Sequence, residues 1–310
     1  MKREFSRAVR LGAARFDGCF AGAVGSWVYD ALRVGLALLF VVRHADWLRP
    51  WLDLEHHRSV YGLMFYDSQP TPPLLRSPWL LGVAFGTSAT RALVLLRTLL
   101  SFTLLLGVRA RLSAALLGGV SLLLLAADRY RYFHHLFLLY VALSWLSLAP
   151  IGQRFTLLGA LRWVRHRALG EVLTRRVTTA SPAWPLQLLR ALTLSVYAAA
   201  GVSKLNENWL QGNALRELEF VGVLTGGAWH LLRNALGYSG VAWAACAFEL
   251  GVCLLLCLRV TRRVAVLSAW GFHASISACM PVYSFGAQMA LLLLTFVGER
   301  TLVLESTETS

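Results

Sequence analysis

Charged residues are scarce in this sequence. Asp, Glu, Lys and Arg together make up 15% of the 310 residues, whereas hydrophobic residues make up 57%. The mean hydropathy of +0.57 is higher than a soluble globular domain normally has, because such a domain needs a polar surface. The composition therefore excludes an ordinary soluble protein and indicates an integral membrane protein.

Cysteine is also rare, with five in the whole chain. Cys246, Cys253, Cys257 and Cys279 lie within or at the end of apolar runs, and Cys19 lies near the N-terminus. No two of them form a CxxC pair, which argues against a zinc knuckle, a thioredoxin-like site or a secreted disulfide framework. The thiols are expected to be packing groups, and no metal site is predicted.

Acidic residues are fewer than basic ones, with 16 Asp and Glu against 30 Lys and Arg and a net charge of +14. The basic residues are scattered over separate segments instead of gathering in one module. Nucleic acid is therefore not an expected partner. The lipid bilayer, with its anionic headgroups, is the partner that this charge fits.

What the sequence does contain is a series of long apolar runs. Eight of them approach the roughly 17–20 residues that a helix needs to cross the hydrocarbon core. They lack strict alternation of polar and apolar residues, which favours helices over a transmembrane β-barrel. The runs lie near 27–43, 92–108, 112–127, 133–149, 186–203, 239–258, 263–279 and 283–298. The predicted fold is all-α, a polytopic transmembrane helical bundle of about eight spans.

The placement of arginine predicts how this bundle is oriented. Short cytoplasmic loops retain positive charge, and with eight spans most basic residues fall on the side that holds both chain ends. We therefore expect a multi-pass protein of the cell membrane with cytoplasmic N- and C-termini. Residues 1–25 are expected to form a basic amphipathic cytoplasmic segment, 26–300 the transmembrane domain and 301–310 a polar tail.

One polar corner follows the fifth run, in "YAAAGVSKLNENWLQG" from Tyr197 to Gly212. In the predicted topology, Lys204 lies at the extracytoplasmic end of that run. Two interpretations remain open. Lys204 snorkels at the interface beside Trp209 as an ordinary belt aromatic, or its amine is partly desolvated and serves as a base. The segment 205–238 is too interrupted to span and is expected to cover such a site.

Other ionisable residues fall at the same face or within the runs. His134 and His135 open the fourth run, at the extracytoplasmic side. Glu249 lies near the middle of the sixth run and His273 in the middle of the seventh. An ionisable group in hydrocarbon is costly, by about 2.5–3.5 kcal/mol on insertion scales, so both are expected to face the bundle interior, close to one another.

Three arginines also lie within runs, namely Arg33, Arg97 and Arg190. The sequence leaves open whether each one snorkels or pairs with Asp30 or Glu249.

Four blocks of sequence carry a resemblance to a known family. They are "YFHHLFLLYVALSWLSLAP", "YAAAGVSKLNENWLQG", "FELGVCLLLCLRVTRR" and "FHASISACMPVYSF", in that order along the chain. Together they resemble the HTTM (horizontally transferred transmembrane domain) family, which is related to the membrane module of vitamin K-dependent gamma-carboxylase. The resemblance covers roughly residues 26–300.

The resemblance implies roles for particular residues. Lys204 stands where the carboxylase has the base that deprotonates vitamin K hydroquinone, and His134 or His135 stands where it has a histidine. Ser203 differs, because the carboxylase has a second lysine there. The implied cofactor is a vitamin K or menaquinone hydroquinone, with Asn206, Trp209, Glu249 and His273 as residues expected to contact it.

Three functions therefore remain as hypotheses. The first is a quinone-linked, carboxylase-like membrane enzyme with an extracytoplasmic site. The second is a non-catalytic accessory protein for maturation or export of a secreted peptide, which would be its partner. The third is a small-molecule transporter that uses Glu249 and His273 as a proton-relay pair, although no internal repeat is evident between the two halves of the sequence.

Overall fold

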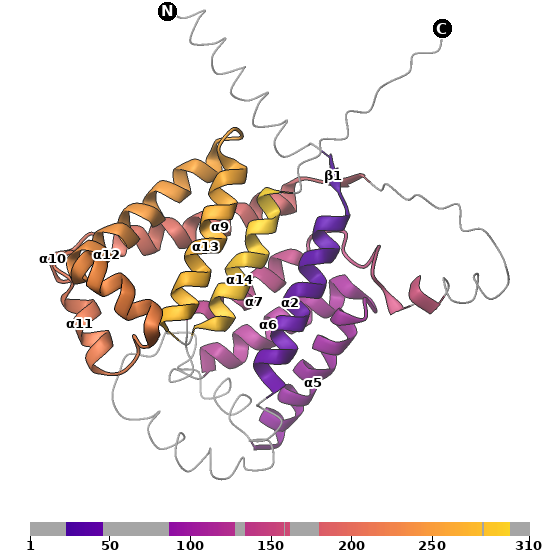
Figure 1. Ribbon diagram of the computed structural model, residues 1–310. Coiled ribbons are helices and arrows are strands. Elements are labelled where there is room, and N and C mark those ends of the chain that lie inside the picture. The colour runs from indigo at the N-terminus through magenta and orange to yellow at the C-terminus, as the bar shows by residue number, and fades with distance from the viewer. Residues whose placement is uncertain are drawn as a thin grey trace, which may run out of the picture. The chain divides into compact units, whose positions relative to one another are not determined.

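A computed structural model describes residues 23–45, 87–127, 134–157, 159–161, 180–280 and 282–297 (Figure 1). The predicted cytoplasmic helix, the polar tail and most of the segment 44–90 lie outside these residues. Within the described part the chain is mostly helical, with two short strands. The prediction of a helical fold is confirmed. The chain divides into two compact units, and the boundary between them in the sequence follows Pro185.

The described residues of the first unit form a bundle of four helices. They are α2 (Trp27–Ala45), α5 (Thr87–Leu105), α6 (Ala110–Ala127) and α7 (His134–Leu146). Each helix packs on the next in the chain, and α2 also contacts α7, which closes the bundle. Its core is built of leucines and aromatics that are almost completely buried, among them Leu36, Phe40, Leu104, Leu117 and Leu143.

Two short strands join distant parts of this unit. β1 (Ala23–Gly25) pairs antiparallel with β2 (Ala180–Pro182), so that Ala23 lies opposite Pro182. The Tyr29 hydroxyl donates a 2.6 Å hydrogen bond to the Pro182 carbonyl and reinforces the pairing. The start of α2 is therefore held beside the residues that immediately precede α9.

The second unit contains α9, α12, α13 and α14 and two shorter helices. The helices are α9 (Trp184–Ser203), α10 (Glu207–Leu210), α11 (Asn213–Phe220), α12 (Gly226–Cys257), α13 (Arg262–Cys279) and α14 (Tyr283–Leu293), which continues into the 3₁₀ turn η4 (Leu294–Phe296). Pro185 lies in the first turn of α9, where the missing N–H of proline costs no helical hydrogen bond.

A kink divides α12 into two parts. Gly237 has a φ of 68° and a ψ of 171°, which lies outside helical geometry and is accessible to glycine. The part before the kink packs with α10 and α11, around buried Leu215, Leu224 and Trp229. The segment 205–238 thus folds as a small helical cap of the second unit.

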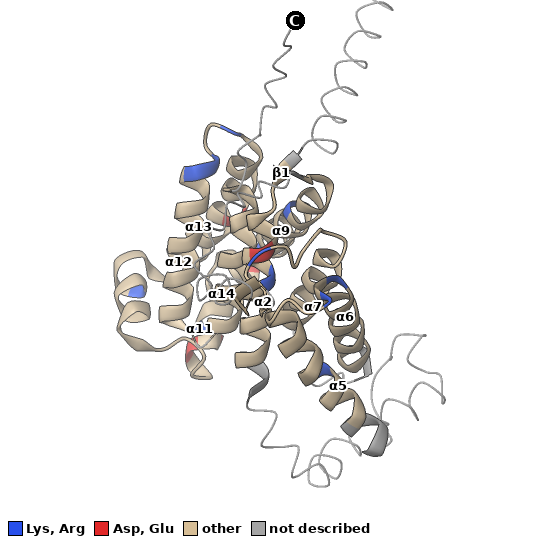
Figure 2. Ribbon diagram, turned by 90° about the vertical axis from the view of Figure 1, so that its right-hand side faces the viewer, with Lys and Arg blue, Asp and Glu red and all other residues tan. Residues whose placement is uncertain are grey.

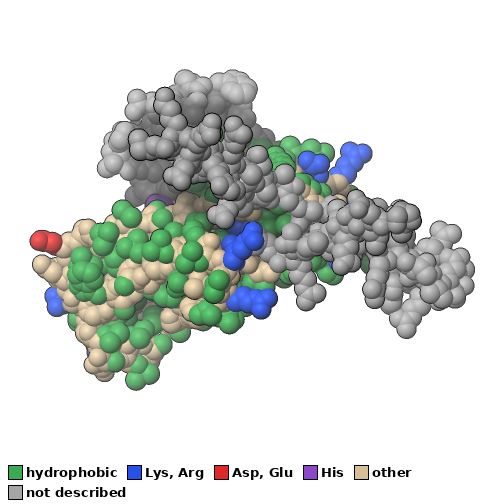
Figure 3. Space-filling view, turned by 90° about the horizontal axis from the view of Figure 1, so that it is seen from above, with side chains coloured by type: hydrophobic (Ala, Val, Ile, Leu, Met, Phe, Trp, Pro, Cys, Tyr) green, Lys and Arg blue, Asp and Glu red, His purple; other side chains and the backbone are tan. Residues whose placement is uncertain are grey.

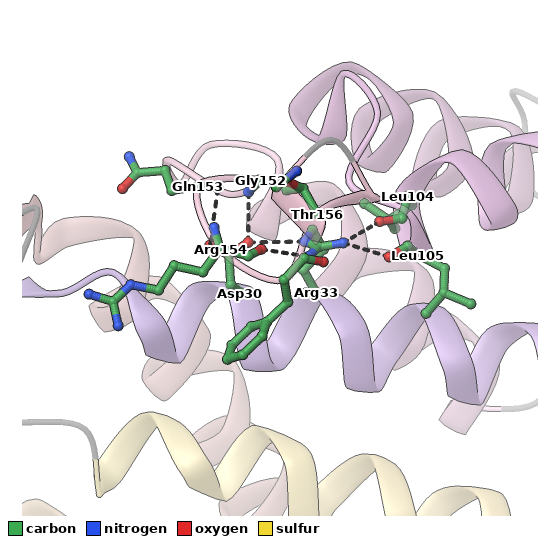
Figure 4. A network of polar contacts seen from close by, with 10 residues as sticks. Asp30, Arg33, Leu104, Leu105, Gly152, Gln153, Arg154 and Thr156 are labelled. Carbon is green, nitrogen blue, oxygen red and sulfur yellow. Dashed lines mark hydrogen bonds and ion pairs between the residues drawn. The ribbon is translucent and has the colours of Figure 1, made fainter. Parts of the chain in front are cut away.

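Arginine binds the carbonyl ends of helices in the first unit (Figure 4). Arg33 makes five hydrogen bonds: to the Asp30 carboxylate, to the carbonyls of Leu104 and Leu105 at the end of α5, and to those of Arg154 and Phe155. Asp30 in turn accepts from the backbone N–H groups of residues 152–154. Both side chains are fully buried. Arg33 therefore pairs with Asp30, one of the two outcomes left open by the sequence.

The second unit uses the same device. Arg190 donates from Nε and Nη2 to the carbonyl of Thr295 in η4, at 2.9 and 2.6 Å. Arg262 donates to the Leu256 carbonyl at the end of α12. Helix C-termini carry unsatisfied carbonyls and a partial negative charge, which a guanidinium satisfies. Arg33, Arg190 and Arg262 therefore have a structural use as caps of helix ends, and Figure 2 shows where basic residues lie on the described helices.

The same spacing of Trp and Arg occurs at the starts of α2 and α9. Trp27 and Arg33 occur in "AVGSWVYDALR", and Trp184 and Arg190 occur at the same spacing in "ASPAWPLQLLR". In both cases a three-residue strand precedes the tryptophan, and the arginine binds carbonyls within its own unit. Only two side chains and a short strand recur, so the likeness is local and is not a repeat between the two halves of the sequence.

The eight apolar runs all coincide with helices, although not every helix meets a strict test for spanning. By length and composition, two of the described helices are long and apolar enough to cross a membrane, namely Trp184–Ser203 and Gly226–Cys257. Large apolar side chains also lie exposed on the outer faces, such as Leu99, Leu254 and Leu267. Figure 3 shows one such face, where hydrophobic side chains cover much of the described surface.

Candidate functional site

Lys204 lies immediately after the end of α9, where the last helical turn is tightened by a bond from its N–H to the Gly201 carbonyl. Its Nζ donates to Glu249 Oε2 at 2.6 Å and to the Ala200 carbonyl at 3.3 Å. The amine also lies 5.1 Å from the centre of the Trp209 ring. The exposed fractions of the Lys204 and Glu249 side chains are 18% and 9%, so this ion pair is largely shielded from surroundings.

Close packing of α9 on α12 brings Glu249 to this position. A Cβ added to Gly201 would lie 2.7 Å from the side chain of Leu250, so the glycine permits the approach. Cys246 Sγ contacts the Gly201 carbonyl and Cys253 Sγ the Leu194 carbonyl, at 3.6 and 3.7 Å. The stripe of thiols that flanks Glu249 therefore packs on α9.

Asn206 and Trp209 organise the corner after Lys204. The Asn206 side chain caps α10, because its Oδ1 accepts from the Trp209 N–H at 2.9 Å and its Nδ2 donates to the Ser203 carbonyl at 2.8 Å. The Trp209 indole donates to the Ala242 carbonyl beyond the kink of α12. The Asn206 side chain is thus an N-cap of α10. It positions Trp209 between the start of the membrane-length part of α12 and the Lys204 amine.

His273 is buried in the middle of α13 with an exposed fraction of 4%. Its Nε2 shares a 2.8 Å hydrogen bond with the Tyr197 hydroxyl of α9. We expected a carboxylate partner for His273, and the hydrogen bond found is with a tyrosine instead. Tyr197 escaped the sequence reasoning because a tyrosine in an apolar run is usually an ordinary core residue.

Aromatic rings surround this histidine. Phe285 of α14 and Phe272 meet it edge-on, at ring distances of 5.5 and 5.6 Å, and Phe272 stacks on Phe248. His273 Nδ1 is buried and, among the described residues, finds no hydrogen-bond partner. A buried polar atom without a partner costs about 1–3 kcal/mol, so this atom is unusual in the core.

A second polar cluster lies in the cap. Glu219 of α11 accepts from the Tyr238 hydroxyl at 2.6 Å and forms an ion pair with Arg233, while His230 Nδ1 lies 3.9 Å away. The hydrogen bond from Tyr238 holds the pKa of Glu219 below its usual value, and the charges of Arg233 and His230 act in the same direction. These contacts tie α11 to both parts of α12.

His134 and His135 are the first two residues of α7 and belong to the first unit, whereas Lys204, Glu249 and His273 belong to the second. That these histidines share a site with Lys204 stays a prediction. Within the described residues, no group of three His, Cys, Asp or Glu side chains comes together in a way that would hold a metal ion.

The apolar outer faces and the two helices long enough to span point to a helical membrane protein, and its second unit holds the shielded Lys204–Glu249 pair. A family model described as the HTTM domain matches residues 83–299, and the chain belongs to this family. The resemblance seen in the sequence is confirmed. Neither the search of curated proteins nor the search of solved structures gives a match.

Proposed function

We propose that this HTTM protein is a multi-pass membrane enzyme in which Lys204 acts as a base on the hydroxyl of an isoprenoid hydroquinone of the vitamin K class. The observation that carries the proposal is the 2.6 Å contact between Lys204 Nζ and Glu249 Oε2. A lysine that only snorkels extends its amine toward water. Here the amine turns toward a carboxylate on a neighbouring apolar helix.

The ion pair supports the role of Lys204 as a base, because the Glu249 carboxylate can accept the proton of its ammonium group. In surroundings of low dielectric, an ammonium–carboxylate pair and a neutral amine–carboxylic acid pair come close in free energy. When the proton rests on Glu249, Lys204 is a free amine. It can then take the hydroquinone proton, forming an N–H bond as the O–H bond breaks, and leave the hydroquinone anion.

Eight membrane crossings, with both termini in the cytoplasm, are part of the proposal. The strand pair supports it, because it holds the starts of α2 and α9 together. An even number of crossings must then separate them, and α2, α5, α6 and α7 supply four. The arginine caps in both units support the same topology. Each one joins the beginning of one helix to the end of a neighbour, as expected when the two helices cross in opposite directions.

This orientation suits a bilayer-soluble substrate. It would put Lys204 at the extracytoplasmic rim, where the polar head of a hydroquinone with an isoprenoid tail would lie. That His134 and His135 donate to the developing anion stays a prediction from the family resemblance. Asn206 and Trp209 fix the backbone after Lys204. The face of the Trp209 ring also lies beside the Lys204 amine.

The test uses purified protein in lipid nanodiscs with menaquinol under anaerobic conditions. The absorbance of the bound hydroquinone reports its ionisation, because the anion absorbs at longer wavelength than the neutral form. Wild type should produce the anion band. Lys204→Arg should not, because a guanidinium stays protonated at any working pH. The matched control is Arg259→Lys, an exchange at an exposed site.

An anion band of wild-type strength in Lys204→Arg would reject the base. Absence of any menaquinol binding in wild type would favour the other roles instead. An accessory protein would retain a secreted peptide on purification and tolerate Lys204→Arg. A transporter would move solute across sealed vesicles.

A further inference from the structure

The part of α12 before its kink, residues 226–236, carries an apolar face that the proposed function leaves unused. We call this part the pre-kink helix. Leu231, Leu232, Ala235 and Leu236 lie on one side of it, because residues three and four positions apart share a helical face. All four are exposed, Leu231 by 74% and Leu236 by 52%. Exposed apolar faces of this kind mark contact with a membrane or with another protein.

The other sides of the pre-kink helix are polar or packed. His230 lies opposite the apolar face, and its side chain is 54% exposed. Trp229 is buried in the core of the cap, and Arg233 forms an ion pair with Glu219 of α11. The pre-kink helix is therefore amphipathic, with one polar, one packed and one apolar side.

The end of α13 is level with the place where α12 kinks. α13 packs on α12, and Phe272 of α13 stacks on Phe248 of α12 at a ring distance of 4.3 Å. These two residues are nearly equally far along the chain from the turn 258–261, so the two helices run side by side from that turn. Ala242, shortly after the kink, and Cys279, at the end of α13, accordingly belong to the same buried cluster.

Both ends of the pre-kink helix lie at this one level. Its start is held there by the Thr225 N–H, which donates to the Cys279 carbonyl at 2.9 Å. Its end is the kink at Gly237, where the rest of α12 begins. A helix that begins and ends at the same level cannot extend away from the other helices. The pre-kink helix therefore runs across the ends of α12 and α13.

The length of α12 places this level at the surface of the bilayer. The part after the kink, residues 238–257, is about 30 Å long at 1.5 Å per residue, which matches the thickness of the hydrocarbon core. When this part crosses the membrane, the kink lies at the boundary between acyl chains and headgroups. The pre-kink helix then lies along that boundary, which is the position that an amphipathic helix prefers.

We infer that the pre-kink helix is an interfacial helix, whose apolar face contacts the acyl chains of the extracytoplasmic leaflet while His230 faces water. The bilayer is favoured over a partner protein because exposed apolar side chains continue along α12 beyond the kink, at Trp243 and Leu254. Those side chains lie against lipid when α12 crosses. The inference rests on the crossing in the proposed function and not on its quinone chemistry.

An interfacial helix holds the cap at a fixed depth in the bilayer. Trp229 packs with Leu215 of α11 in the buried cluster, and Trp209 of α10 packs against the same cluster. The Trp209 ring lies beside the Lys204 amine. The lipid contact of the pre-kink helix therefore keeps the corner after Lys204 at the membrane surface, where the polar head of a bilayer-soluble substrate would lie.

Spin labelling of the full chain in lipid nanodiscs tests the inference. Single cysteines replace Leu231 and Ala235 on the apolar face and His230 on the polar side, in a background with the native cysteines replaced. Power saturation of the EPR signal measures collisions with oxygen, which concentrates among acyl chains, and with a nickel chelate, which stays in water. The ratio of oxygen to nickel collisions should be several-fold higher for Leu231→Cys and Ala235→Cys than for His230→Cys. Leu254→Cys, on the part of α12 after the kink, is the lipid-facing reference.

Ratios at Leu231→Cys and Ala235→Cys that match His230→Cys would place the pre-kink helix in water and overturn the inference. Few collisions with either reagent at both sites would show that protein covers the apolar face, which overturns it too. If one of these two variants loses helical content by circular dichroism, the other decides alone. Failure of the crossing is separate, because nickel would then also reach Leu254→Cys. The base at Lys204 is tested independently, by the anion band of menaquinol.

Discussion

Arg33 shows how a single side chain can hold the first unit together. All five of its N–H groups are used, and the guanidinium joins α2 to the end of α5 and to residues 154 and 155. Lysine keeps the charge but has three donors and no planar fork. Arg33→Lys should therefore destabilise the protein markedly, and Asp30→Asn should too because it leaves the guanidinium without its counter-charge.

The expected loss for either variant is about 3–5 kcal/mol, the range for breaking a buried ion pair. Thermal unfolding in detergent, followed by circular dichroism, measures it. Arg259→Lys serves as the control because that side chain is exposed. Equal melting temperatures for Arg33→Lys and the control would show that the network contributes little.

Glu219 gives the cap a dependence on pH. Its pKa lies below the usual value in the folded protein, first because Tyr238 donates to it. A lowered pKa stabilises the fold above the unfolded-state pKa, and that stabilisation is lost as pH falls through the folded-state pKa. Amide exchange of α11 should therefore accelerate, beyond its intrinsic change, as the pH drops below the ordinary range of glutamate. In Tyr238→Phe this acid-sensitive component should shrink, and an undiminished one would contradict the assignment.

At the scale of elements, the approach of α9 to α12 determines the geometry of the Lys204 site. A methyl group at position 201 would overlap Leu250, and it would also lie 3.3 Å from the Leu250 backbone nitrogen. Gly201→Ala should cost about 1–3 kcal/mol by overpacking and should lengthen the Lys204–Glu249 contact. Gly251→Ala is the matched control, because nothing lies within 4 Å of the Cβ it would add.

The control should be neutral or stabilising, since alanine favours the helix by about 0.5–1 kcal/mol over glycine. Melting temperature and the anion band of bound menaquinol measure the two effects. A Gly201→Ala protein as stable as Gly251→Ala would mean that the two helices adjust freely.

The long helices could be predicted from the sequence because each one coincides with a long apolar run. Every run became a helix, because length and hydrophobicity are local properties. The hydrogen-bond and ion-pair partners of the polar side chains were harder to predict from the sequence. Arg33 could be matched to Asp30 because they lie one helical turn apart, but Lys204 and Glu249 meet only through the packing of α9 on α12. Tyr197 and Gly237 gave no signal, since neither a buried phenol nor a kink changes the apolar pattern.

At the scale of the whole molecule, the proposed topology places the two ends of the second unit on opposite sides of the bilayer. Val260, in the turn between α12 and α13, is 93% exposed, and Phe220, at the end of α11, is 92% exposed. In a background with the native cysteines replaced, Phe220→Cys should react with an impermeant maleimide in intact cells. Val260→Cys should react only after the membrane is opened. Reaction of both from the same side would reject eight crossings.

The pairing of β1 with β2 also imposes an order on biosynthesis. The two strands are separated by the whole of the first unit, so Ala23 must wait for Pro182 to leave the ribosome before it can find its partner. Under the proposed topology, the four helices of the bundle will by then have entered the membrane with β1 still unpaired. The first unit then closes only when α9 begins to emerge, so a ribosome that pauses earlier carries a bundle whose β1–β2 pairing has not formed.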